Sequence, residues 1–404
     1  MIFVIVKCHL LKNEKIDNLN VKINYNNSIV MDDNNKIVIC NLNEILLTPV
    51  DKLTCLQCLT FDHSFNQSLF NSLDKSTCLQ HLTFGNDFNQ PLINSLDKLT
   101  SLQYLIFGYS FNKPLSNSLV KLTSLEYLTF GSSFNQPLSN SLDKLTSLEY
   151  LTFDYNFNQP LSNSLDKLTS LEYLTFGCNF NQPLSNSLDK LTSLQYLTFG
   201  VYFNKPLSNS LDKLTSLQCL KFGDSFNKLL SNSLDKLTLL QYLTFGYSFN
   251  QPLSNSLDKL TCLQCLTFGE SFNKPLSNIL VKLTFLQYLV LGYYFVQPLD
   301  LPPNIKYLVL NCSNENMIDN LHNNIEELTL DYNFNLELNN LPSSIKKIII
   351  YNNDYDKELN NFPSSVEYIG LPLHYEKKIL IIPKNLKEIK CDKYYEFIDD
   401  FYNC

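Results

Sequence analysis

The stretch FNQPLSNSLDKLTSLEYLTFGCNFNQPL, Phe157 to Leu184, begins and ends on the same five residues. Its Phe–Asn pair recurs every 23 residues from Phe65 to Phe272, and Phe295 follows in phase. A period of this size is typical of solenoids, because one repeat unit cannot bury its apolar face without its neighbours. The sequence therefore predicts a repeat array rather than an ordinary globular domain.

Each unit contains one short predicted strand, in the segment SLEYLTFG and its copies. Leu148, Leu151 and Phe153 are placed to point inward, whereas Tyr150 and Thr152 alternate with them and point outward. The position after the strand is occupied by Gly in nine of eleven units and by Asp in the other two. Both residue types tolerate unusual backbone angles, so a tight turn is expected there.

The Asn of each Phe–Asn pair follows an inward Phe in a turn whose backbone groups have no strand partner. A column of identical Asn side chains can satisfy such groups. We therefore predict a structural asparagine ladder that starts at Asn66 and runs along the array. Its members are Asn89, Asn112, Asn135, Asn158, Asn181, Asn204, Asn227, Asn250 and Asn273.

After this turn the chain returns to the next strand through LSNSLDKL. Leu161, Leu165 and Leu168 are spaced by four and three residues, which favours a short helical or 3-10 return. Strand, turn and return together form one coil of an α/β solenoid of the leucine-rich-repeat (LRR) kind, with a parallel sheet on one face.

Two arrays and two end segments make up the predicted organisation. Residues 53–299 hold eleven 23-residue units, residues 300–392 hold five units of 20 or 21 residues, and about sixteen coils result. Residues 1–52 are the expected N-terminal cap, and the acidic tail 393–404 is the C-terminal candidate for a cap. The shorter units open at Ile305, Ile325, Ile345, Val366 and Leu386, with Pro303, Pro342, Pro363 and Pro383 just ahead of the apolar stretch.

The motifs LTFGxxFNQPL and LPSSIKKI resemble the FNIP repeats of amoebae and of giant DNA viruses, over most of residues 53–392. In that family an F-box is often attached, which would imply a substrate-recognition subunit of a ubiquitin ligase. Residues 1–52 show no clear F-box helix pair, and Pro is followed by Leu where the family name implies Ile before Pro.

Composition narrows the possible functions. The 404 residues carry a net charge of −8, lack Arg, and have no clustered basic face of the kind that binds nucleic acid. No apolar run has the roughly 20 residues of a membrane helix, and Lys7 interrupts the apolar start MIFVIVKCHLL, which we interpret as a first strand. Twelve scattered cysteines favour a reducing compartment. We expect a cytoplasmic monomer, in the host cytoplasm if the protein is viral.

No catalytic or cofactor-binding group stands out, so the sequence predicts a protein that is not an enzyme. One metal candidate arises from CLQC at Cys55 and Cys58 and CLQH at Cys78 and His81. These residues occupy the repeat columns that hold Ser and Tyr in other units, so the repeat explains their spacing without zinc. A zinc-binding domain at 55–81 stays an alternative.

Function is expected on the exposed strand face, as a protein-interaction surface. One outward column there is rich in aromatic residues, and a second is mostly Thr. Tyr combines a large contact area with one polar group, which suits protein recognition. Tyr and Thr are also good strand formers, so a purely structural role remains open. The candidate interaction residues are Tyr104, Tyr127, Tyr150, Tyr173, Tyr196, Tyr242 and Tyr288.

Overall fold

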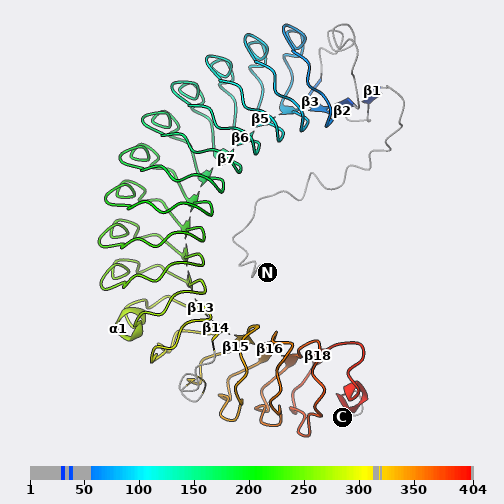
Figure 1. Ribbon diagram of the computed structural model, residues 1–404, viewed down its shortest axis with the longest axis vertical. Coiled ribbons are helices and arrows are strands. Elements are labelled where there is room, and N and C mark those ends of the chain that lie inside the picture. Colours follow the sequence, from blue (N-terminus) through cyan, green and yellow to red (C-terminus); the bar gives the residue numbers. More distant parts are fainter. Residues whose placement is uncertain (1–28, 32–35, 40–55, 313–317, 319–320, 402–404) are drawn as a thin grey trace.

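The chain winds into an open arc of stacked coils, with the strands on the inner, concave side and the return segments on the outer side (Figure 1). The computed structural model describes residues 29–31, 36–39, 56–312, 318 and 321–401. Cys55 and the apolar start of the chain, expected to form a first strand, lie outside these residues.

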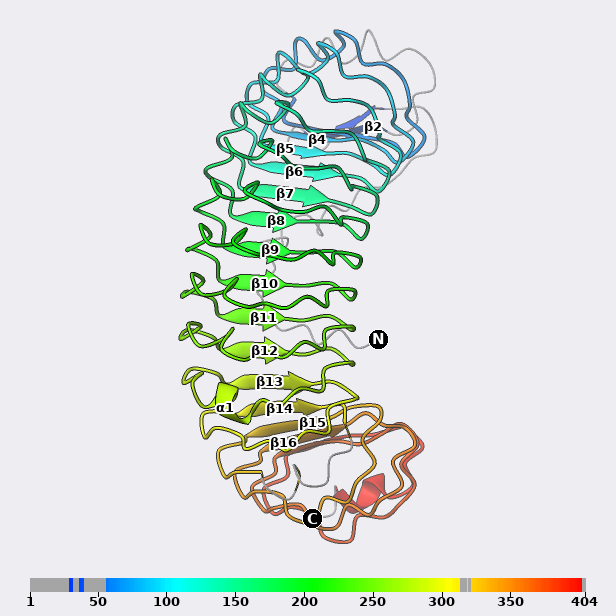
Figure 2. The same cartoon turned by 60° about the vertical axis from the view of Figure 1, so that its left-hand side comes forward.

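One continuous sheet holds the coils together, and Figure 2 shows its strands stacked side by side. Each strand from β2 to β18 pairs in parallel with the next, and β1 pairs antiparallel with β2. The sixteen predicted coils correspond to β3–β18, so the predicted LRR-like fold is confirmed.

The first array and its N-terminal neighbours contain β1 (Ile29–Met31), β2 (Lys36–Ile39), β3 (Cys58–Phe61), β4 (His81–Thr83), β5 (Tyr104–Ile106), β6 (Tyr127–Phe130), β7 (Tyr150–Phe153), β8 (Tyr173–Thr175), β9 (Tyr196–Thr198), β10 (Cys219–Lys221), β11 (Tyr242–Thr244), β12 (Cys265–Thr267) and β13 (Tyr288–Leu291). The second array contains β14 (Tyr307–Leu310), β15 (Glu327–Leu330), β16 (Lys347–Ile350), β17 (Tyr368–Gly370) and β18 (Glu388–Lys390). The helical segments are α1 (Ser277–Leu280) and the 3-10 helix η2 (Ile398–Phe401).

The strands pair so that equivalent repeat positions face each other, as in Leu151 of β7 opposite Leu174 of β8. In β7, Leu151 and Phe153 are buried, and Tyr150 and Thr152 are half-buried. A parallel register that matched unlike columns would place polar side chains in the core, so the repeat fixes the register.

Two columns of phenylalanine fill the core of the first array. Phe153 at the end of its strand stacks on Phe157 of the same coil at 3.9 Å between ring centroids. Phe157 in turn lies 6.1 Å from Phe180 of the next coil. In the second array this spine continues with Tyr355, Tyr375 and Tyr395, whose hydroxyls donate to backbone carbonyls at 2.9–3.1 Å. Burying a phenol requires such an acceptor.

The glycine column has a different cause from the one expected from the sequence. None of the ten glycines has a positive φ. Instead, a Cβ added at Gly177 would lie 1.8 Å from the carbonyl oxygen of Asp154 in the preceding coil. All nine glycines of the column meet the preceding carbonyl oxygen in this way, at 1.7–2.4 Å. The column therefore permits close approach of two backbones rather than an unusual turn conformation.

Where the glycine column holds a residue other than Gly, the strand of that coil pairs with the preceding strand over one additional residue. Asp154 donates its N–H to the carbonyl of Phe130 at 3.2 Å, and Phe130 pairs with Phe153. The same arrangement recurs in the second array, where Asn311, Asp331 and Tyr351 donate to the last strand residue of the preceding coil. A side chain in the glycine column is thus tolerated when the backbone at that position continues the hydrogen bonding of the sheet.

The return segments contain little helix. Ser164, Leu168 and Leu171 each donate a backbone N–H to the carbonyl three residues earlier, which gives separate 3-10-type turns. A positive φ precedes these turns, 45° at Ser162, and recurs at the equivalent serines. In the unit that has β-branched Ile93 at this place, the positive φ moves to Asn94, because Asn tolerates the left-handed region far better.

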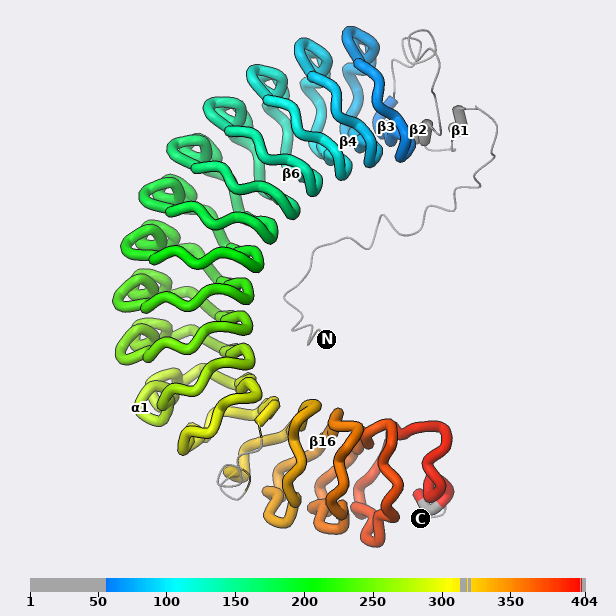
Figure 3. The backbone as a smooth tube through the Cα atoms, in the orientation of Figure 1, coloured from blue at the N-terminus to red at the C-terminus, as the bar shows by residue number. Residues whose placement is uncertain are grey.

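The coils of the second array are shorter, and their outer loops are smaller (Figure 3). In four of the five coils, the N–H of Ile345 or its equivalent donates to the carbonyl of a proline three residues earlier, and in the coil that opens at Ile325 the acceptor is the carbonyl of His322. In the first of these coils the accepting proline is Pro302, which directly precedes Pro303. At the C-terminal end, Tyr395 is buried, and Phe397, Ile398 and Phe401 pack against the core.

Candidate interaction face

Three outward columns of side chains lie on the face of the sheet that Figure 1 shows to be concave. The first column immediately precedes each strand of the first array and holds Gln or Glu. The tyrosine column begins each strand, and the threonine column lies two residues further on. Glu149, Tyr150 and Thr152 represent them in β7, and all three are half-buried.

An uninterrupted aromatic stack occupies the tyrosine column across six coils. Neighbouring rings lie 4.1–4.3 Å apart between centroids and within 12° of parallel. Its members are His81, Tyr104, Tyr127, Tyr150, Tyr173 and Tyr196.

The two remaining candidate tyrosines, Tyr242 and Tyr288, lie in the same column beyond this stack. Cys219 separates Tyr242 from Tyr196, and Cys265 separates it from Tyr288. Tyr288 lies 6.1 Å from Tyr307 between ring centroids, too far apart for the close stacking of the central rings. Five of the seven candidate tyrosines are therefore brought into one continuous stack.

Two of the stacked tyrosines, Tyr104 and Tyr150, have raised pKa values. Burial raises the pKa of Tyr104 to about 12, with a further contribution from Tyr127 and from Glu126 and Glu149. Burial also raises the pKa of Tyr150, and the hydroxyls of Tyr127 and Tyr173 add to the effect. At neutral pH Tyr104 and Tyr150 thus present neutral hydroxyls, which can both donate and accept hydrogen bonds.

The first column carries three consecutive carboxylates beside this stack, Glu126, Glu149 and Glu172. Their backbones are direct neighbours, since the N–H of Glu149 donates to the carbonyl of Glu126 and that of Glu172 to the carbonyl of Glu149, both at 2.9 Å. Partial burial raises the pKa of Glu149, and the charges of Glu126 and Glu172 raise it further. In the other eight units of the first array the column holds glutamine: Gln57, Gln80, Gln103, Gln195, Gln218, Gln241, Gln264 and Gln287.

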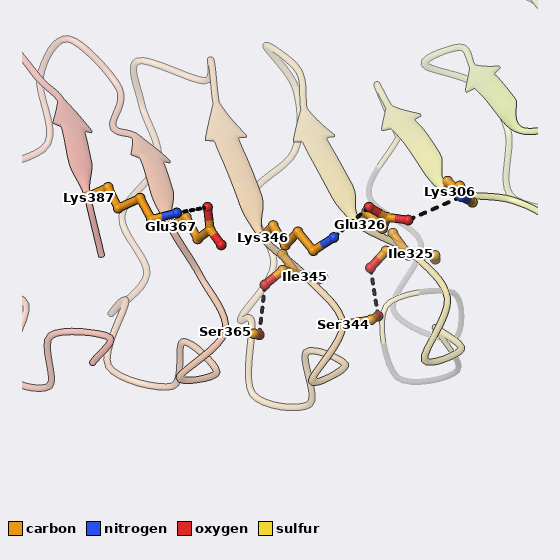
Figure 4. A network of polar contacts seen from close by, with 9 residues as sticks. All are labelled: Lys306, Ile325, Glu326, Ser344, Ile345, Lys346, Ser365, Glu367 and Lys387. Carbon is orange, nitrogen blue, oxygen red and sulfur yellow. Dashed lines mark hydrogen bonds and ion pairs between the residues drawn. The ribbon is translucent and has the colours of Figure 1, made fainter. Parts of the chain in front are cut away.

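In the second array the equivalent column alternates between Lys and Glu, and the side chains of neighbouring coils form ion pairs within the column (Figure 4). Glu326 lies between Lys306, at 3.4 Å, and Lys346, at 2.8 Å, and Glu367 pairs with Lys387 at 2.7 Å. The same view shows Ser344 and Ser365 donating to the carbonyls of Ile325 and Ile345 in the preceding coils. Ser344 and Ser365 are each the second serine after the proline, so these hydrogen bonds explain the second Ser in LPSSI and in the equivalent FPSSV.

The asparagine column forms a ladder along the edge of the sheet. Oδ1 of Asn158 accepts the N–H of Asn181 at 2.9 Å, and Asn158 itself donates to Asn135. The same bond, at 2.9–3.1 Å, links every successive pair from Asn66 to Asn273 and ends on the N–H of Val296. From Asn89 onward these side chains are half-buried. Sequence reasoning missed a continuation in the second array, where Asn335 accepts the N–H of Asp356.

A shallow polar groove of about 500 Å³ follows part of this edge. The asparagines of the ladder line it together with a second asparagine column, in which Asn179 donates to Asn156 at 2.9 Å. Tyr202 closes one side. The Oδ1 atoms of the ladder that line this groove already accept backbone N–H groups of the next coil, so their main role is structural.

The possible zinc site receives no support within the described residues, in which no group of three or more His, Cys, Asp or Glu side chains is placed to hold a metal ion. Cys58 faces His81 across adjacent strands, Cys78 is exposed, and Cys55 lies outside the described part of the chain. None of the eight cysteines within that part forms a disulfide. None of the described helices is long and apolar enough to cross a membrane.

Comparison with known proteins agrees with the solenoid fold. Residues 86–230 match the family described as leucine-rich repeat region, and residues 332–374 match the FNIP repeat. No curated protein matches the sequence. The FNIP match falls in the shorter coils of the second array, and the leucine-rich-repeat match falls in the first.

Several solved structures share this architecture. An internalin (InlF) of Listeria monocytogenes superposes with a TM-score of 0.57 at 20% identity, over 80% of this chain and 87% of that one. Toll of Drosophila, solved in a Toll–Spätzle complex, gives 0.59 at 15% identity, over 91% and 51%. CroV588, a circular LRR protein, is 26% identical over 84% of this chain and 63% of that one, with a TM-score of 0.43.

The chain thus spans about half the length of the Toll structure and less than two thirds of CroV588. At these levels of identity the internalin and Toll similarities describe the fold. Together with the two family matches, they show that the chain folds as a leucine-rich-repeat-like solenoid, with a leucine-rich-repeat region at residues 86–230 and an FNIP repeat at residues 332–374.

Proposed function

We propose that this chain is a non-enzymatic interaction scaffold that binds a partner protein with the concave face of its sheet. The observation that carries the proposal is the aromatic stack from His81 to Tyr196, which runs unbroken over six coils of the exposed face. Side chains already ordered by stacking lose little conformational entropy on binding, and Tyr is enriched in protein interfaces.

The alternative is that the tyrosines serve the sheet alone. Against it, Cys219, Cys265, Glu327 and Lys347 occupy the same column, and their strands keep the same parallel register as the others. The sheet therefore forms without Tyr at this position. A continuous run of Tyr exceeds what strand pairing requires, which supports a role in recognition.

Affinity capture from a lysate of cells that produce the protein tests this proposal. One variant changes Tyr127, Tyr150, Tyr173 and Tyr196 to Ser on the concave face. A matched control changes the same number of exposed tyrosines in the edge turns to Ser: Tyr109, Tyr155, Tyr202 and Tyr247. Circular dichroism establishes that both are folded.

We expect the wild type and the edge variant to capture the same partner and the concave variant to lose it. Unchanged capture by the folded concave variant would show that the aromatic stack is structural. Loss of capture by the edge variant alone would show that the partner binds the edge turns instead of the concave face.

We further propose that the protein works in a reducing compartment, as a cytoplasmic monomer. The eight cysteines of the described residues, none of which forms a disulfide, support this placement. Alkylation of the protein in intact cells, followed by mass spectrometry, should find its twelve cysteines reduced. A stable disulfide among them would argue for an oxidising compartment.

A further inference from the structure

The concave face of β5–β9 differs in charge from the rest of the sheet. In the first array, the three outward columns contain four residues of an acidic or basic type other than histidine: Glu126, Glu149, Glu172 and Lys221. The three carboxylates are consecutive, and Lys221 lies two coils beyond Glu172. The face around the aromatic stack is therefore locally acidic.

The fold does not require these carboxylates. Glutamine occupies the same column in the coils on both sides, and Gln103 and Gln195 sit in strands paired in the same register as those of β6–β8. Three adjacent like charges also oppose one another: partial burial raises the pKa of Glu149 first, and the charges of Glu126 and Glu172 add to it. Carboxylates at this place thus cost stability that glutamine would not.

No cation of the described chain offsets them. Gln103 donates its Nε2 amide to Glu126 at 3.1 Å, and no ion pair to these three carboxylates forms within the described residues. The second array shows the contrast, because there the equivalent column supplies its own lysines (Figure 4). A partner protein with basic side chains would supply for Glu126, Glu149 and Glu172 the ion pairs that lysines supply in the second array.

We propose that the concave face formed by Glu126, Glu149, Glu172 and the flanking stacked tyrosines docks an extended, basic segment of a partner protein. This inference rests on the proposed function and specifies the partner's chemistry. Lysine or arginine side chains of the segment pair with the carboxylates, and its polar groups hydrogen-bond to the tyrosine hydroxyls.

The geometry limits what such a segment looks like. Three neighbouring strands place their first-column residues over roughly 10 Å, at about 4.8 Å per strand. An extended chain covers this distance in about three residues, so two or three basic side chains within four residues reach all three carboxylates. Because each inner tyrosine is covered on both ring faces by its neighbours, it offers its hydroxyl and ring edge rather than a cation–π face.

Fluorescence anisotropy with defined peptides tests the inference. The probe is a short labelled peptide of alternating Lys and Ser, compared with peptides in which Glu or Gln replaces Lys. The test variant combines Glu126→Gln, Glu149→Gln and Glu172→Gln, each of which installs the residue found in neighbouring coils. The matched control combines Asp143→Asn, Asp166→Asn and Asp189→Asn, which removes three charges from the return segments of the same region.

The wild type and the Asp→Asn control should bind the lysine peptide equally and in preference to the other two. The Glu→Gln variant should bind it about tenfold more weakly, as expected for three partly exposed ion pairs. Equal binding by all three proteins, or an equal loss in both variants, would overturn the inference, because the charges would then act non-specifically or not at all.

The partner found by affinity capture separates this inference from the proposed function. A partner lost from the tyrosine variant but held fully by the Glu→Gln variant contradicts the basic segment and leaves the interaction face intact. A partner held by the tyrosine variant contradicts the interaction face itself.

Discussion

At the residue scale, two columns hold one coil against the next where the sheet itself does not reach. The asparagine ladder satisfies a backbone N–H in each turn, and the glycine column lets the backbone pass beside the preceding carbonyl. Both depend on one side chain per coil, so single substitutions test them.

Replacing Gly177 with Ala should destabilise the protein strongly. The new Cβ would lie 1.8 Å from the backbone oxygen of Asp154, so the two coils must separate. Gly370→Ala is the control, because there the nearest atom is a side-chain methyl of Ile349 at 3.1 Å. Thermal unfolding should show a lower Tm for the first variant and a small change for the second. Equal Tm values would refute the steric explanation of the column.

Replacing Asn158 with Ala should leave the N–H of Asn181 without its acceptor, at a cost of about 1–3 kcal/mol. Amide hydrogen exchange is the appropriate measurement, because it reports opening at the affected coil. Exchange should accelerate at Asn181 in this variant. Asn163→Ala, which changes an exposed asparagine of the return segment, should leave that amide protected. Unaltered protection in both would exclude a structural role for the ladder.

At the scale of elements, the outward columns differ from the core columns in what they tolerate. The core positions repeat Leu and Phe with hardly a change, because each fills a space shaped by identical neighbours. The first column instead holds Gln, Glu or Lys, and its charge pattern is the main chemical difference between the two arrays.

Glu149→Gln should stabilise the protein at neutral pH by about 0.2–1 kcal/mol, by removing a cross-strand like-charge contact. Partial burial, together with Glu126 and Glu172, holds the pKa of Glu149 above its ordinary value of 4.5 in the folded protein. The fold therefore binds this proton more tightly than the unfolded chain does. Stability is lost as the pH rises from the ordinary pKa through the folded one.

Urea unfolding of the Glu149→Gln variant and the wild type at several pH values measures this effect. The difference should be present at neutral pH and vanish below about pH 4, where the carboxyl is protonated in both states. Glu367→Gln, which removes the partner of Lys387, should give no such stabilisation. A difference that does not depend on pH would indicate a packing effect instead.

At the scale of the whole molecule, stability should be distributed along the arc, because each coil contacts only its neighbours. Removing residues 393–404 would uncover the end of the core at Tyr375, which Tyr395 now covers. Hydrogen exchange should then accelerate in β17 and β18 and remain unchanged in β5–β12. Acceleration throughout would show that the solenoid unfolds as one unit.

The sequence predicted the solenoid, its strands and the inward Leu and Phe positions, because a repeat of fixed period exposes them directly. It gave the wrong reason for the glycine column, since close approach to Asp154 or Gly200 is set by a coil 23 residues away rather than by local backbone preference. It singled out the tyrosine column but overlooked Glu126, Glu149 and Glu172. Their meaning depends on side-by-side placement and on the contrast with Lys306 and Lys346 in the second array.

The measurement that tests the central claim most directly is a hydroxyl-radical footprint of the protein with and without its captured partner. If the concave face is the interaction face, oxidation of Tyr127, Tyr150 and Tyr173 should fall when the partner binds. Oxidation of Tyr109 and Tyr155 in the edge turns should stay the same. Protection of the edge tyrosines, with no change on the concave face, would contradict the account.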